Sequence, residues 1–135
     1  MISEYNELRK DKIIRVEENK KKFIINNKDL LLINHVKVDG YLITTGNRCD
    51  HLFEIISLKK VFYVELKGSD IKHALEQLLD TIIFCEKFHA NFNKECFIVC
   101  SRVPKETPRT QVLKVNLSKK GIKLKVSSNE LVVNL

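Results

Sequence analysis

The sequence has no long hydrophobic run, and this limits the classes of protein to which it can belong. Its apolar stretches are far shorter than the ~20 residues that a membrane-spanning helix needs. The first residues, MISEYNELRKDK, lack the apolar centre of a secretory signal peptide. We therefore expect a soluble, cytoplasmic protein with no membrane association.

Glycine and proline are also scarce, with four and two residues in a chain of 135. The content of 44% hydrophobic and 30% charged residues is that of a globular protein and not of a disordered or repetitive one. A chain of this length can bury roughly two thirds of its unfolded surface. We expect residues 1–135 to form a single domain.

Cysteine motifs are missing as well. The four cysteines have no CxxC spacing, and the four histidines are scattered along the chain. This pattern indicates neither a zinc site nor a redox pair. Buried or free thiols in a reducing compartment are the simplest interpretation.

Positive charge is in excess, and it is concentrated near the C-terminus. The formal net charge is +7, and residues 101–135 contain eight Lys or Arg against two Glu. A local surplus of this kind is typical of proteins that bind a polyanion, because basic side chains release counterions from phosphates. Solubility alone is the alternative explanation.

The hydrophobic pattern predicts an α/β protein with a central mixed β-sheet flanked by helices. Residues 3–18 have near-helical spacing, and a second helix is expected from Ser69 or Asp70 to about Ala90. Strands are expected at 23–26, 30–38, 41–44, 49–56, 61–67, 96–103, 112–117, 122–126 and 131–133. The strand, helix and strand order from residue 61 to residue 103 predicts a crossover with parallel pairing. The last strands are expected to form a basic hairpin.

Charged residues occur in the predicted hairpin of residues 49–67, where apolar residues would pack better. If the hairpin turns symmetrically between Ile56 and Val61, Asp50 lies opposite Lys67. Because strand side chains alternate between faces, Glu65 shares the face of Lys67 and Asp50. Two carboxylates and an ammonium group are then close together beside the start of the second helix.

Such a cluster has a chemical use. Two carboxylates and a phosphate oxygen suit Mg²⁺ or Mn²⁺, so we expect Asp50 and Glu65 to be metal ligands. The bound ion can polarise a phosphodiester and activate a water, and Lys67 can position that water. The alternative is structural: Asp50 and Lys67 form an exposed cross-strand ion pair worth under ~1 kcal/mol.

The stretch also resembles a known family. Asp50, the tripeptide Glu65-Leu66-Lys67 and a following helix with Gln77 resemble the motif of the PD-(D/E)XK nuclease superfamily, which has the restriction-endonuclease-like fold. The resemblance covers roughly residues 49–80, although Cys49 stands where the motif's name has proline. It implies that Asp50 and Glu65 bind Mg²⁺, that Lys67 is the catalytic lysine and that Gln77 assists.

The resemblance also implies a glutamate near the N-terminus. Many members carry one on their first helix, and Glu4, Glu7, Glu17 or Glu18 is available, of which we prefer Glu7 because it is central in ISEYNELRK. His51 and His73 flank the motif and either is a candidate phosphate contact, although plain surface histidines are the simpler interpretation.

Together these features predict a small Mg²⁺-dependent endonuclease that acts on nucleic acid, with DNA favoured over RNA. The length leaves little room for a sequence-reading domain, so structure-selective cleavage is expected, in a homodimer of the size of the superfamily's Holliday-junction resolvases. A non-catalytic nucleic-acid-binding module and an interaction or immunity-type protein are the alternatives. The expected nucleic-acid contacts are Lys114, Lys119, Lys120, Lys123 and Lys125.

Overall fold

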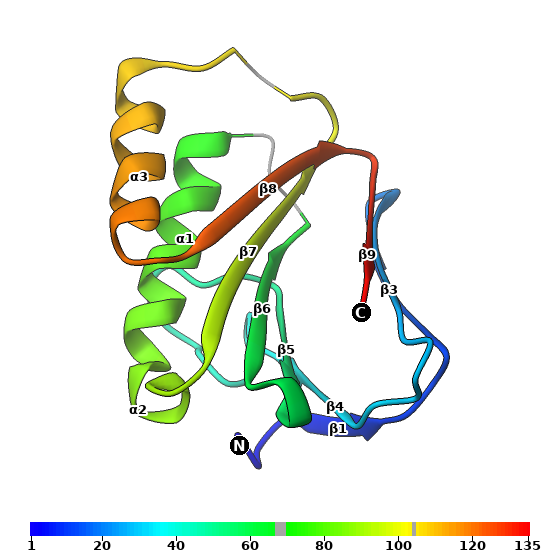
Figure 1. The fold of residues 1–135 in the computed structure, drawn as a ribbon. Helices are drawn as coiled ribbons and strands as arrows, with labels where there is room; N and C mark the ends of the chain where they lie inside the picture. Colours follow the sequence, from blue (N-terminus) through cyan, green and yellow to red (C-terminus); the bar gives the residue numbers. More distant parts are fainter. Residues whose placement is uncertain (67–69, 104) are drawn as a thin grey trace.

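A computed structural model of the protein describes residues 1–66, 70–103 and 105–135. These residues form an α/β fold with a six-stranded sheet and a three-stranded sheet. The helices cover one face of the larger sheet and the smaller sheet lies over the other (Figure 1). The molecule therefore has three layers, with a hydrophobic core on each side of the larger sheet.

The larger sheet has the strand order β1-β4-β5-β6-β7-β8. Its strands are β1 (Asn6–Arg9), β4 (Ile33–Lys37), β5 (His51–Ile55), β6 (Lys60–Glu65), β7 (Asn93–Cys100) and β8 (Lys123–Ser128). Neighbours from β1 to β6 pair antiparallel, whereas β6, β7 and β8 pair parallel. The mixed sheet and the parallel crossover between β6 and β7 are thus confirmed.

The helices are α1 (Ile71–Phe84), α2 (Glu86–His89) and α3 (Pro108–Lys119). Asp70 caps α1, because its carboxylate accepts hydrogen bonds from the backbone N–H groups of Lys72 and His73. The apolar side of α1 packs on the sheet through Ile71, Ala74, Leu75, Leu78 and Ile82. The strong helix predicted after residue 69 is confirmed, although it ends at Phe84 and the short α2 follows.

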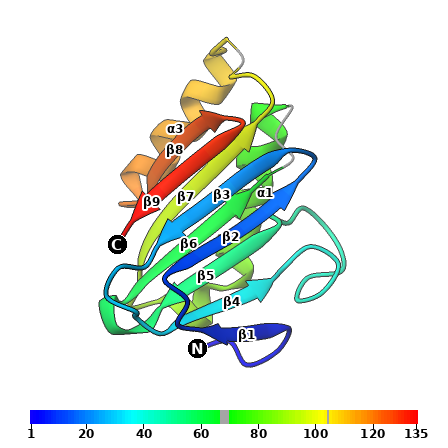
Figure 2. The ribbon, with the colours of Figure 1, turned by 90° about the vertical axis from the view of Figure 1, so that its right-hand side faces the viewer.

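The opposite face of the larger sheet is covered by strands and not by a helix. The smaller sheet has the order β2-β3-β9, with strands β2 (Ile13–Glu18), β3 (Lys21–Asn26) and β9 (Glu130–Asn134) (Figure 2). Phe23 on β3 packs against Phe53 and Phe97 of the larger sheet, with ring centroids 5.7 and 5.1 Å away. Helices therefore flank the central sheet on one side only.

A helix over residues 3–18 was the wrong prediction. These residues form β1 and β2, and Ile14 and Val16 alternate with exposed residues as a half-buried strand requires. Asn19 and Lys20 both have positive φ, which allows the tight turn that joins β2 to β3. The apolar spacing of this segment is closer to period two than to the helical period.

The C-terminal basic hairpin was also a wrong prediction. Residues 112–117 lie within α3, which begins with a capping box between Thr107 and Thr110 and has Pro108 in its first turn. β8 pairs with β7 and β9 pairs with β3, so the chain passes from one sheet to the other between Ser128 and Glu130. Residues 41–44 form a turn closed by a bridge between Asp39 and Ile43, and not a strand.

A buried hydrogen-bond network holds the N-terminal segment and α2 to the sheet. Glu54 on β5 accepts hydrogen bonds from the backbone N–H of Ile2 at 3.0 Å and from the Asn34 amide at 2.7 Å. Its other carboxylate oxygen lies 2.5 Å from His89 Nε2, and His89 Nδ1 lies 2.6 Å from the Tyr63 hydroxyl. Glu54 and His89 are fully buried and line none of the pockets described below, so this network is structural.

All four cysteines are free and buried. Within the described residues, none of the helices has the length and apolarity that crossing a membrane requires.

Candidate active site

The β5–β6 hairpin places the two motif carboxylates at neighbouring strand ends. Asp50 immediately precedes β5, and Glu65 is the last residue of β6. The hairpin itself was predicted, but its register was not. His51 pairs with Val64, and the backbone N–H of Asp50 donates to the carbonyl of the same Val64 at 3.1 Å, so Asp50 meets β6 at Val64 in place of the predicted position 67. Asp50 and Glu65 therefore lie at the same end of the hairpin.

The turn of the hairpin explains the difference in register. Residues Ile56–Leu58 form a 3₁₀ turn, and Lys59 follows in the left-handed conformation with φ of 49°. Lys60 consequently already pairs with Ile55, so the strands are displaced by two residues from the symmetric arrangement. A displacement of two residues leaves the paired residues on their expected faces, but Asp50 precedes the paired segment and lines the same pocket as its neighbour His51.

Both carboxylates are almost fully buried, with exposed fractions of 6% for Asp50 and 1% for Glu65. An Asp50 oxygen accepts a hydrogen bond of 2.8 Å from the backbone N–H of Leu66. Burial, followed by the nearby charges of Glu65 and Asp50, raises the pKa of the Cys49 thiol well above its usual value. Cys49 is thus a neutral packing residue beside two acidic groups.

Asp50 lines a pocket of about 330 Å³ between β2 of the smaller sheet and β4 and β5 of the larger sheet. The pocket is rich in groups that bind cations or exchange protons. Its lining residues are Val16, Glu17, Glu18, His35, Lys37, Asp39, Tyr41, Asp50 and His51. Strand β2 therefore brings Glu17 and Glu18 to the same cavity as Asp50.

The N-terminal glutamates occupy different places. Glu18 is half-buried at the end of β2 and one of its carboxylate oxygens is enclosed by protein atoms, so the side chain points inward. Glu7 is exposed on β1 and lines a neighbouring pocket with His35. Glu4 is exposed and lines neither pocket. Among the four candidates, Glu17 and Glu18 share the Asp50 pocket and the preferred Glu7 does not.

Gln77 supports the site from α1. Its amide donates a hydrogen bond of 3.0 Å to the backbone carbonyl of Arg48, and one turn later the Thr81 hydroxyl accepts one of 2.9 Å from the backbone N–H of Cys49. These bonds fix the backbone that leads into Asp50. Gln77 is not among the lining residues of the two pockets described near Asp50, and its hydrogen bond to the Arg48 carbonyl is that of a positioning residue.

Two histidines that the motif does not include lie in the pocket. His35 Nε2 and His51 Nδ1 are 2.9 Å apart, and the His35 ring stacks on Phe53 with a centroid distance of 4.5 Å. Burial, followed by the charges of His51, Arg9 and Lys37, lowers the pKa of His35 to about 3. His35 is therefore neutral at physiological pH. His73, by contrast, is exposed on α1.

The donor set suits a hard divalent cation. Mg²⁺ is usually held by one or two carboxylates together with substrate phosphates and waters, and Asp50 and Glu65 are two such groups. No group of three His, Cys, Asp or Glu side chains in the described part of the chain is arranged to hold a metal ion. The protein would therefore supply two carboxylate ligands, and waters and substrate phosphates would occupy the other coordination positions of the metal. Lys67 lies outside the described residues.

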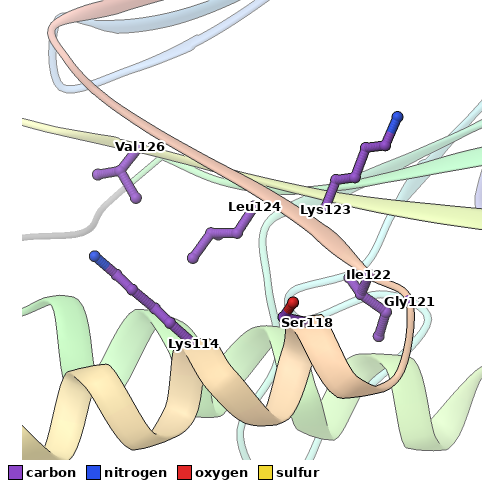
Figure 3. Close-up of a pocket in the computed structure, with 7 residues that line it drawn as sticks. All are labelled: Lys114, Ser118, Gly121, Ile122, Lys123, Leu124 and Val126. Carbon is purple, nitrogen blue, oxygen red and sulfur yellow. The ribbon is translucent and has the colours of Figure 1, made fainter.

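The five predicted nucleic-acid contacts do not form one hairpin surface. Lys114 belongs to α3 and is bonded to Glu106, whereas Lys119 and Lys120 are exposed where the helix ends. A groove of about 780 Å³ lies between α3 and β8, where Lys114 and Ser118 point toward the strand (Figure 3). Lys123 also lines this groove, but the end of its side chain points away from α3, whereas Lys114 points from α3 toward the strand (Figure 3).

The register of the sheet also separates these lysines from the carboxylates. Glu65 pairs with Ile98, which in turn pairs with Val126, so Lys125 lies one residue and Lys123 three residues before that level on β8, and two strands away from Glu65. Other basic residues lie nearer the carboxyl ends of β6 and β7. They are Lys72 on α1 and Arg102, Lys105 and Arg109 after β7. The sequence alone did not indicate them, because their placement depends on the parallel pairing of these strands.

No protein-family model, curated protein or solved structure matches the chain.

Proposed function

We propose that the protein is a divalent-metal-dependent nuclease of the PD-(D/E)XK type that hydrolyses phosphodiester bonds of DNA, with selectivity for structure and not for sequence. The observation that carries this proposal is that the buried Asp50 and Glu65 carboxylates lie at the same end of the β5–β6 hairpin, with Asp50 lining a solvent-accessible pocket. Placing two anionic groups together in a buried position is costly unless a cation or a hydrogen-bonding partner compensates.

The arrangement of elements supports the same proposal. The mixed sheet and the helix α1 that follows Glu65 agree with the restriction-endonuclease-like core that the motif implies. The motif does not imply the three-stranded sheet that covers the face of the larger sheet opposite the helices. A bound Mg²⁺ or Mn²⁺ would supply charge stabilisation at the phosphate and a more acidic water.

The chain's own residues would have distinct tasks. Asp50 and Glu65 would hold the cation, and Glu18 would extend the acidic lining of the pocket. Gln77 and Thr81 would fix the backbone before Asp50. Lys67 would position the attacking water, and the exposed lysines of α3 and β8 would bind phosphates of a longer substrate.

Cleavage assays test the proposal. Purified protein is incubated with single-stranded, duplex and branched DNA and with RNA, in Mg²⁺, in Mn²⁺ and in EDTA. We expect cleavage of DNA only with a divalent ion. Lys67→Ala should retain the Mg²⁺-dependent rise in Tm but lose cleavage by at least ~10², because the carboxylates remain and the group that positions water is gone. A wild-type protein that neither cuts nucleic acid nor responds to Mg²⁺ or Mn²⁺ would refute the proposal.

A non-catalytic nucleic-acid-binding module on the same fold is the second candidate. Four exposed lysines favour this candidate, because their charges can bind a polyanion whether or not the carboxylates hold a metal ion. They are Lys119, Lys120, Lys123 and Lys125. Salt-dependent binding without cleavage in any metal would support this candidate. A homodimer would offer two such surfaces, and analytical ultracentrifugation with and without DNA tests that state.

A further inference from the structure

Two exposed tyrosines lie side by side next to the Asp50 pocket. Tyr5 and Tyr41 have exposed fractions of 55% and 50%, and their ring centroids are 5.9 Å apart with an interplanar angle of 59°. Tyrosine is enriched at interfaces, because its ring offers an apolar face and its hydroxyl stays in contact with water. The third tyrosine of the chain, Tyr63, is fully buried. The other two rings are thus paired and accessible to a ligand.

The backbone holds Tyr41 in its exposed position. Its N–H donates to the Val38 carbonyl at 3.2 Å, and the N–H of Ile43 donates to the same carbonyl at 3.1 Å. Ile43 is buried, and Gly40 adopts φ of +77°, a conformation that few other residues tolerate. The turn is therefore anchored on both sides of Tyr41 while the ring itself faces solvent.

Tyr5 is held in place in a different way. It has φ of 54°, which is unusual for an aromatic residue and is retained only when its surroundings enforce it. Its carbonyl accepts a hydrogen bond of 3.0 Å from the Lys37 N–H, and Ile2, three residues earlier, is buried in the core. The ring is thus presented to solvent by an anchored and strained segment.

The tyrosines lie on a surface continuous with the candidate active site. The Asp50 pocket and a second pocket of about 350 Å³ share His35, Lys37 and Tyr41 in their linings. Tyr5 lines the second pocket, so a path leads from Asp50 past Tyr41 to Tyr5. Lys37 lines both pockets, and its ammonium lies 5.6 Å from the centre of the Tyr41 ring, which places a positive charge beside that ring.

We propose that Tyr5 and Tyr41 are a stacking platform for unpaired nucleobases of a strand that passes the Asp50 pocket. This proposal rests on the proposed function and narrows its substrate class to nucleic acid with a single-stranded segment. Aromatic rings beside a basic side chain are the usual recognition elements for single strands, because every base has a face that can stack. Duplex bases are stacked on one another and cannot occupy the platform without being extruded.

Intrinsic fluorescence gives a direct test, because the chain contains no tryptophan and two of its three tyrosines form the platform. Short oligothymidylate is titrated into the protein in EDTA, so that no cleavage occurs. We expect tyrosine fluorescence to be quenched on binding. A length-matched abasic oligonucleotide carries the same phosphates without bases, and it should bind more weakly and cause little quenching.

The variants separate stacking from charge. Tyr41→Leu and Tyr5→Leu should each weaken oligothymidylate binding by at least about five-fold, whereas Tyr41→Phe should retain it because the ring remains. Phe84→Leu is the matched control, since Phe84 is an exposed aromatic on α1 with an exposed fraction of 48% and lines none of the pockets near Asp50. Circular dichroism verifies that each variant is folded.

Failure of the platform and failure of the nuclease proposal are distinguishable. Cleavage by wild type without quenching, together with unchanged binding in both leucine variants, would overturn the platform and leave the nuclease proposal standing. Quenching and weakened binding in the leucine variants, with no cleavage in any metal, would support the platform on a non-catalytic binding module. Equal binding of the abasic and the oligothymidylate strands would overturn the platform whatever the cleavage assay shows.

Discussion

The Asp50 carboxylate accepts a hydrogen bond of 2.8 Å from the backbone N–H of Leu66. This bond ties the beginning of β5 to the residue that follows β6, and both residues are buried. Asp50 therefore has a structural task in addition to the proposed metal-binding one. The two tasks are separable, because an amide oxygen can accept the same hydrogen bond without carrying charge.

Asp50→Asn should preserve the fold but remove the metal response. We expect its free energy of unfolding to lie within about 1 kcal/mol of wild type, since the acceptor for Leu66 remains. Cleavage and the Mg²⁺-dependent rise in Tm should both disappear. Asp50→Ala should cost a further ~1–3 kcal/mol, because the buried Leu66 N–H loses its acceptor. Urea denaturation and thermal melts with and without Mg²⁺ measure these effects, and a persistent Mg²⁺ shift in Asp50→Asn would argue against this residue as a ligand.

Glu18 should matter more than Glu7 for activity. Glu18 lines the pocket of Asp50, whereas Glu7 is exposed on the edge strand β1. Glu18→Gln should lower metal-dependent cleavage by at least ~10², and Glu7→Gln should change it by less than a few-fold. Cleavage rates as a function of Mg²⁺ concentration compare the two matched substitutions. A larger loss of cleavage in Glu7→Gln than in Glu18→Gln would support Glu7, the glutamate preferred from the sequence, as the functional residue.

The exposed lysines at the end of α3 and on β8 should set the salt dependence of duplex binding. Replacing Lys119, Lys120 and Lys123 with Gln should flatten the slope of log affinity against log salt by about 0.9 for each phosphate that the variant no longer neutralises. Lys114→Gln is the control. Lys114 is already hydrogen-bonded to Glu106, so its substitution should change the slope little. Fluorescence anisotropy over a series of salt concentrations gives the slopes. An unchanged slope in the triple variant would remove these residues from the interface.

The sequence predicted local features well where one signal was dominant. The helix after Asp70 has a continuous apolar stripe and an N-cap residue, and the β5–β6 hairpin has two β-rich runs around a short turn. Both elements were found, and with them the neighbouring positions of Asp50 and Glu65. Lys67 lies outside the described residues, so the role of the complete motif stays a prediction.

Elsewhere the signals conflicted. In α3, Val112 and Val115 favour a strand by composition, but both are exposed, and the capping box at Thr107 determines the helix. In β2, pairing with β3 outweighs a weak helical spacing. The contribution of Glu18 to the site depends on the smaller sheet packing across the larger one. Such long-range packing has no local signature in a single sequence.

His35 should make the protein less stable as the pH falls. Its pKa is lowered to about 3 in the folded protein, chiefly by burial, whereas an unfolded histidine titrates near ~6.5. Between these values the unfolded state binds a proton that the folded state does not, so stability is greatest above about pH 6.5 and declines by up to ~1.4 kcal/mol for each pH unit below it. His35→Gln should reduce this slope, whereas the exposed His73→Gln should leave it unchanged. Urea denaturation of the three proteins at pH values of about 7, about 6 and about 5 measures the difference. If wild type and His35→Gln lost stability in parallel over this range, another group would be responsible for the acid sensitivity.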